Sequence, residues 1–120
     1  MKKNGLNKSE RLCSKAAIDR LFEPGSGSKS IAAFPIRLVY GESAQQTAML
    51  VSVPKRHFHH AVDRNRVKRQ VREAYRQNKH LLPEGKAMHL AFIWLDSKHY
   101  PTHVIYNKVC NLLQRCSERL

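Results

Sequence analysis

The chain has 120 residues, of which 22 are lysine or arginine and 9 are aspartate or glutamate, so its formal net charge is +13. A chain of this length holds one domain with one modest core. No apolar run approaches the roughly 20 residues that a membrane-spanning helix needs, because the longest, "LAFIWL", has the length of a strand. We therefore expect a single domain, residues 1–120, whose positive charge favours nucleic acid as a partner over a membrane.

Export and a disulfide framework are both unexpected for this chain. The start, "MKKNGLNKSERL", has the lysines of a signal peptide but no apolar run after them, and we treat residues 1–9 as a flexible basic tail. The cysteines at positions 13, 110 and 116 are odd in number and lack C-x-x-C spacing. We therefore expect free thiols in a reducing cytoplasm, without a zinc site built from them.

The first predicted element is a short helix over residues 14–22, "SKAAIDRLF". Ser14 is a suitable N-cap, and Ile18, Leu21 and Phe22 share one side at i, i+3 and i+4 spacing. The serine- and glycine-rich stretch that follows, "EPGSGSKS", indicates a flexible connector over 23–30.

Two strands are predicted next, over residues 34–40 and 47–53, because both segments are rich in β-branched and aromatic residues. A polar stretch separates them, which favours an antiparallel hairpin. Pro35 favours an edge position or a strand start, since proline donates no ladder hydrogen bond. Residues 54–60, "PKRHFHH", then form a basic loop.

A long helix over 61–80 follows the loop and ends before Pro83 and Gly85. Residues 88–95 predict a strand apolar enough to be covered on both faces. A closing helix over 101–118 begins with a proline, which suits a first turn. The order of these elements, α-β-β-α-β-α, is typical of a small α+β sandwich.

The long helix divides into two faces when its residues are placed at about 100° intervals. The face expected to be buried consists of Val67, Val71, Ala74, Tyr75 and Leu81. The basic row consists of Arg64, Lys68, Arg72 and Arg76 at i+4 spacing, with Arg69 alongside. Like charges at this spacing destabilise an isolated helix, and Asp63 and Glu73 are too few to neutralise them.

A polyanionic partner explains this row better than a merely solubilising face, because ordinary solvated faces mix charges of both signs. Phosphates neutralised along the row would release condensed counterions and so contribute affinity. The dominance of arginine favours forked phosphate contacts or stacking on bases. A membrane-surface or calmodulin-binding helix would need an exposed apolar stripe, whereas this helix needs its stripe for the core.

The histidines of "HFHH", residues 57–60, invite a metal site with Asp63 as a further ligand. Asp63 is more simply the N-cap of the long helix, and the surrounding cations would repel a metal, so we predict none. The acids show no clustering in sequence that would hold magnesium. We therefore expect no catalytic residue in the protein.

The segments "ERLCSKAAIDRLF", "SVPKR" and "AVDRNRVKRQVREAYR" resemble the protein subunits of bacterial ribonuclease P. The signature is R-N-R-x-K-R-x-x-R-E, and the resemblance covers nearly the whole chain from about residue 10. It implies a two-layer α+β sandwich with a mainly antiparallel four-stranded sheet and three helices, in the order α-β-β-β-α-β-α. It also implies a left-handed crossover through the long helix, where a general rule would favour the right-handed form.

The resemblance implies a function as well. The family's subunit binds a catalytic RNA, which with its own Mg²⁺ removes the 5′ leader from precursor tRNA, and one protein is expected per catalytic RNA. Carried over to this chain, the catalytic-RNA surface is Arg64, Asn65, Arg66, Lys68, Arg69, Arg72 and Arg76. The leader groove is Ile18, Phe22, Arg37, Ser52, Lys55 and Arg56.

Two of the groove positions depart from the family pattern, since some relatives place aromatic residues where this chain has Ile18 and Arg37. Phe22 is as well suited to core packing as to stacking on a base. Two other functions stay open on the residues alone, a small structural RNA-binding protein of ribosomal type and a protein-only metallonuclease.

Overall fold

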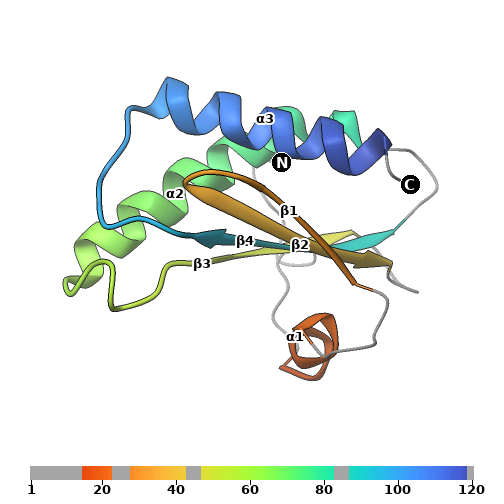
Figure 1. The fold of residues 1–120 in the computed structure, drawn as a ribbon, viewed down its shortest axis with the longest axis horizontal. Helices are drawn as coiled ribbons and strands as arrows, with labels where there is room; N and C mark the ends of the chain where they lie inside the picture. The colour runs from red at the N-terminus through yellow and green to blue at the C-terminus, as the bar shows by residue number, and fades with distance from the viewer. Residues whose placement is uncertain (1–14, 23–27, 43–46, 83–86, 119–120) are drawn as a thin grey trace, which may run out of the picture.

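The computed structural model describes residues 15–22, 28–42, 47–82 and 87–118. One mixed sheet carries two helices on one face and a short helix on the other (Figure 1). The elements are α1 (Lys15–Phe22), β1 (Lys29–Ala33), β2 (Ile36–Glu42), β3 (Ala48–Ser52), α2 (Ala61–Asn78), the 3₁₀-helix η2 (Lys79–Leu81), β4 (Met88–Trp94) and α3 (Thr102–Glu118). The α+β class and the order α-β-β-β-α-β-α are therefore confirmed.

The predicted hairpin between residues 34–40 and 47–53 is wrong, because β2 and β3 are not neighbours in the sheet order β1-β2-β4-β3. The hairpin is formed instead by β1 and β2, joined at Phe34 and Pro35 through a cis peptide bond. Lys29 and Ser30, assigned to the connector, already pair with β2. The small residues of β1 concealed it, while Pro35 lies directly before β2 as a strand-start proline should.

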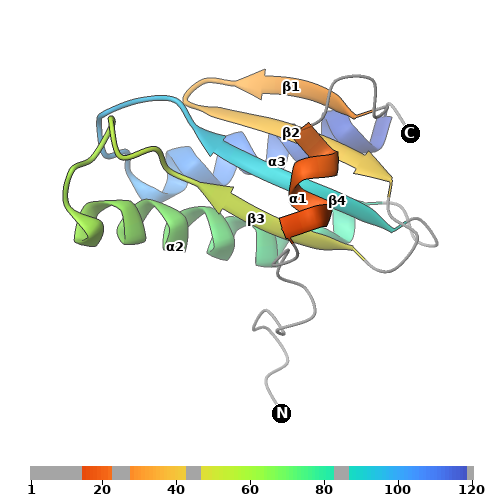
Figure 2. The ribbon, with the colours of Figure 1, turned by 90° about the horizontal axis from the view of Figure 1, so that it is seen from below.

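Strand β4 lies in the interior of the sheet, antiparallel to β2 and parallel to β3. Helix α2 makes the connection from β3 to β4. In Figure 2 both strands run toward the left, α2 lies behind the sheet and β4 lies above β3, which is the left-handed form of this crossover. The handedness implied by the resemblance is therefore the one observed, against the general preference.

The core lies between the sheet and the layer formed by α2 and α3. Alternate residues of β4 (Met88, Leu90, Phe92 and Trp94) face this layer and are almost fully buried. Burial of each such large side chain contributes about 1.5–3 kcal/mol. The predicted stripe of the long helix is confirmed. Val67, Val71, Ala74 and Tyr75 of α2 are buried, and Leu81, which lies in η2, is partly buried.

The opposite face of the sheet, here called the outer sheet face, is covered only in part. Helix α1 packs there through Leu21 on Ala48 and Ala91, with Ile18 at the margin. The prediction that β4 is covered on both faces thus holds for its middle, and Ile93 stays half-buried. Ser14, the basic tail 1–9 and most of the connector lie outside the described residues.

Candidate nucleic-acid interface

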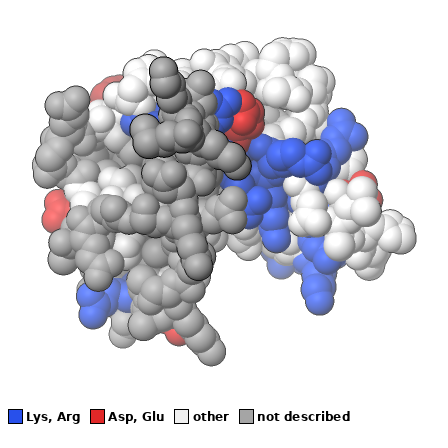
Figure 3. Space-filling view, turned by 180° about the vertical axis from the view of Figure 1, so that it is seen from behind, with Lys and Arg blue, Asp and Glu red and all other residues white. Residues whose placement is uncertain are grey.

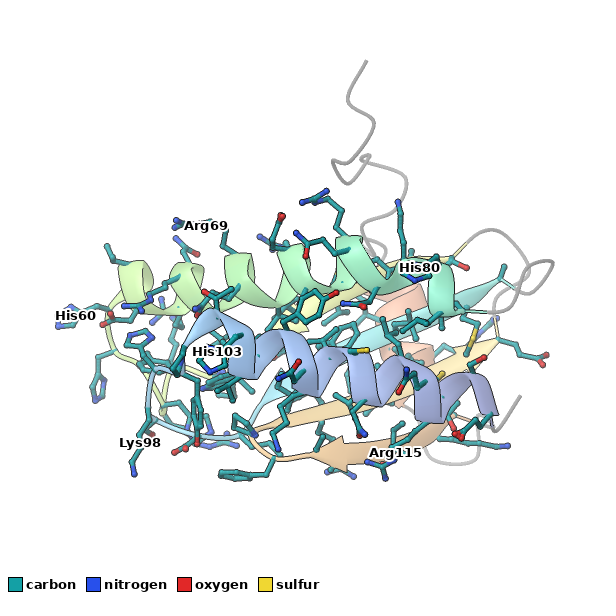
Figure 4. All side chains as sticks on the ribbon, turned by 90° about the horizontal axis from the view of Figure 1, so that it is seen from above. His60, Arg69, His80, Lys98, His103 and Arg115 are labelled. Atoms are coloured by element: carbon teal, nitrogen blue, oxygen red, sulfur yellow. The ribbon has the colours of Figure 1, made fainter. Side chains whose placement is uncertain are left out.

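The basic row lies along the side of α2 that faces away from the core. Figure 3 shows lysine and arginine side chains gathered over this helix, and Figure 4 shows Arg69 pointing away from α3. Asn65, Arg66 and Arg69 are exposed, and the remaining predicted residues, Arg64, Lys68, Arg72 and Arg76, are half-buried. In the described part of the chain, neither Lys68 nor Arg69 has an ion-pair partner, so the centre of the row keeps its positive charge.

The residues at the two ends of the row, Arg64 and Arg76, bind other groups of the protein. Arg64 donates from Nη1 to the backbone oxygens of Phe58 at 2.8 Å and His59 at 2.9 Å. Arg76 forms an ion pair with Glu73 one turn earlier, with a 3.1 Å bond from Nε to Oε2. That hydrogen bond lowers the pKa of Glu73, so the acid stays ionised and offsets the last cation of the row.

The start of α2 differs from the prediction. Its N-cap is His60, whose side chain makes no capping bond, and Asp63 lies inside the first turn. An acid in that turn still interacts favourably with the helix dipole. Asp63 Oδ1 instead contacts Nε2 of His99 at 3.1 Å, a partner 36 residues away that no local pattern could indicate.

The residues predicted for the leader groove come together in part on the outer sheet face. Arg37 and Ser52 both pair with Ile93 of β4, one from each side, so these three lie in one row across the sheet. Arg37 is exposed and donates from Nη2 to Ser30 Oγ at 3.2 Å. Sequence reasoning missed Ile93, although the alternation of β4 would have placed it opposite the core.

The other predicted groove residues lie in the loop after β3 and in α1. Lys55 and Arg56 are exposed in the loop directly after β3. Phe22 is 44% exposed at the end of α1 and is no part of the core. Ile18 packs against the small cluster under α1, so much of its apolar surface is already used.

The histidines of the basic loop do not converge. Phe58 is buried, whereas His59 and His60 are exposed, and Nδ1 of His57 lies 3.1 Å from Ser97 Oγ. Throughout the ranges that the structure describes, no three His, Cys, Asp or Glu side chains are grouped so that they could hold a metal ion. Over the same residues, no helix is both long and apolar enough to cross a membrane.

A mixed sheet with two helices on one face, one of which carries an arginine-rich side turned to solvent, defines a small basic α+β protein. Residues 6–117 match the family model of ribonuclease P. The chain belongs to the ribonuclease P family.

Individual relatives agree with this assignment. The ribonuclease P protein component of Porphyromonas gingivalis is 51% identical over 82 residues, which cover 65% of this chain and 58% of that protein. The corresponding protein of Nitrosococcus oceani is 35% identical over 82 residues, covering 68% of this chain and 67% of its own length. The chain thus spans 58% of the length of the P. gingivalis relatives that it matches.

Solved structures show the same fold. The ribonuclease P protein of Thermotoga maritima superposes with a TM-score of 0.74 at 23% identity, covering 88% of this chain and 96% of that one. That of Staphylococcus aureus gives a TM-score of 0.76 at 22% identity, covering 91% and 96%.

Proposed function

We propose that this chain is the protein subunit of a ribonuclease P ribonucleoprotein that removes the 5′ leader from precursor tRNA. The proposal is supported above all by the central part of the α2 row, where the half-buried Lys68 and the exposed Arg69 have no acidic partner among the described residues. Such a row is unfavourable in the free protein and favourable against phosphates.

In this proposal α2 binds the catalytic RNA through Arg64, Asn65, Arg66, Lys68, Arg69, Arg72 and Arg76. The outer sheet face, with Phe22, Arg37, Ser52, Lys55, Arg56 and the margin residue Ile18, binds the leader. Because α2 lies behind the sheet and α1 in front of it (Figure 2), the two RNA segments would meet different sides of the molecule. The protein would then join substrate to ribozyme.

The chemistry would belong to the RNA and its Mg²⁺, and the protein would hold no cofactor. What the side chains offer is binding and orientation. The planar guanidinium of Arg37, steadied by Ser30, suits a phosphate or the face of an unpaired base. We further propose a cytoplasmic location and one protein per catalytic RNA.

Reconstitution tests the proposal directly. The chain is mixed with a bacterial catalytic RNA at low Mg²⁺, and cleavage of precursor tRNA is followed against the RNA alone. Stimulated cleavage is the expected result. Binding without stimulation would favour a structural RNA-binding protein of ribosomal type, and cleavage by nuclease-treated protein alone would favour a metallonuclease.

A further inference from the structure

The segment that joins β3 to α2, residues 54–60, is here called the basic loop. It leads from the end of β3, exposes Lys55 and Arg56, and reaches the first turn of the arginine-rich helix. It is therefore the covalent link between the two proposed RNA surfaces. His60, at its end, lies at the same end of the molecule as Lys98 and His103 (Figure 4).

One side of the basic loop is held by α2. The guanidinium of Arg64 donates to two successive loop oxygens, at 2.8 and 2.9 Å. Donors that carry a charge make stronger hydrogen bonds than neutral ones. This contact ties the loop backbone to a residue of the basic row.

The other side is held by the segment between β4 and α3. Phe58 is 8% exposed and belongs to the main core, and its ring stacks on His99 with centroids 4.6 Å apart. His57 contacts Ser97 in the same segment. The loop is thus anchored by an aromatic stack and by a polar contact.

The bond between His99 and Asp63 joins these two sides. A carboxylate oxygen only accepts hydrogen bonds, so the 3.1 Å contact places a hydrogen on Nε2 of His99. Nδ1 of the same ring is buried and has no partner among the described residues. The ring is therefore oriented by Asp63 on one edge and by Phe58 on its face.

We infer that His99 and Asp63 are positioning residues that hold the basic loop in one conformation against the first turn of α2. An ordered loop loses less conformational freedom when it binds RNA, and so binds more tightly than a mobile loop with the same charges. Tighter binding of the precursor leader by the ordered loop rests on the proposed function. The ordering of the loop by His99 and Asp63 does not.

Hydrogen exchange of the full-length protein tests the loop directly. The reporters are the amide of His57, which donates to Pro54 O at 3.0 Å, and the amide of Arg64, which donates to His60 O at 3.2 Å. We expect His99→Ala to speed their exchange about ten- to a hundredfold, as for the loss of one hydrogen bond to a charged group. Amides of β4 should exchange at the unchanged rate.

Three further variants separate positioning from general loss of structure. Asp63→Asn keeps an accepting oxygen and should exchange nearly as the unaltered protein does, with the Nε2 proton of His99 still visible by NMR. Asp63→Ala should lose that signal and free the loop. His103→Ala removes an exposed histidine four residues further on and should change neither reporter.

The outcomes are distinguishable. Unchanged exchange in the basic loop of His99→Ala, or equal acceleration throughout the core, would overturn the inference. Faster exchange confined to the loop would uphold it. If a holoenzyme reconstituted with His99→Ala then binds leader-bearing precursor as tightly as the unaltered holoenzyme does, the loop has no part in the proposed function. The positioning role of His99 would still hold.

Discussion

Replacing Lys68 and Arg69 together by alanine removes two cations from the centre of the basic row. Neither residue has an ion-pair partner in the described part of the chain, and alanine is the best helix former. Their removal also relieves the repulsion of Lys68 with Arg64 and Arg72, which lie one turn before and one turn after it. We therefore expect the free energy of unfolding to stay the same or to rise by a few tenths of a kcal/mol, while affinity for the catalytic RNA falls.

The magnitude follows from counterion release. Each phosphate contact contributes about 0.7–0.9 to the slope of log affinity against log salt, so two lost contacts flatten the slope by about 1.4–1.8. Between about 50 and 200 mM salt, the unaltered protein should then lose about seven- to twelvefold more affinity than the variant. Filter binding or fluorescence anisotropy over a salt series measures this difference.

A matched variant controls for overall charge. Lys29→Ala with Lys108→Ala removes the same number of charges from β1 and α3, and should leave the slope nearly as it is. An unchanged slope in the α2 variant would place the RNA elsewhere. Equal flattening in both variants would mean that net charge, and no particular surface, sets the affinity.

Three further predictions concern single side chains. Phe22→Ala should cost less stability than the about 3–5 kcal/mol of a buried phenylalanine, because this ring is 44% exposed, and should weaken binding of leader-bearing precursor more than of mature tRNA; equal weakening of both would contradict its role. Burial raises the pKa of Cys116 to about 11, so alkylation near about pH 8 followed by mass spectrometry should modify Cys110 before Cys116, and preferential labelling of Cys116 over Cys110 would refute this. The hydroxyl of Tyr100 donates to Asp96 at 2.5 Å and lowers the pKa of that carboxyl. The resulting stability is complete above the ordinary Asp pKa and is lost as pH falls through the lowered value, so Tyr100→Phe should reduce the difference between denaturant midpoints at neutral and strongly acid pH; an unaltered difference would contradict this.

Patterns within one element were sufficient to predict the helices and the central strand. The buried stripe of α2 repeats every three to four residues, which indicates a helix. The apolar run of β4 is short and continuous, which indicates a strand in the interior of a sheet. Strand pairing could not be predicted from patterns within one element. Neighbouring strands in sequence usually pair, but here β1 has only Ile31 as a large apolar residue, so β2 was matched with the wrong partner.

The candidate site likewise has features that local sequence patterns predict and features that only the packing of the chain determines. The basic row follows from spacing along one helix. The bond of Asp63 to His99 depends on how segments 36 residues apart pack. The bonds of Arg64 to oxygens five and six residues earlier depend on the path of the loop. Spacing along the helix indicates neither of them. The sequence predicts Asp63 as an N-cap because capping is a common local role of aspartate at a helix start.

The interior strand β4 is also the last of the described strands to be synthesised. Among the described strands, β3 has no neighbour other than β4, and β2 and β3 are joined only through it. A nascent polypeptide that stops before Met88 can form the β1–β2 hairpin but no continuous sheet. Its basic segments then have no sheet to pack against. We therefore expect the four-stranded sheet to form only after β4 has been synthesised, and a chain that terminates earlier to lack the folded surfaces proposed to bind RNA.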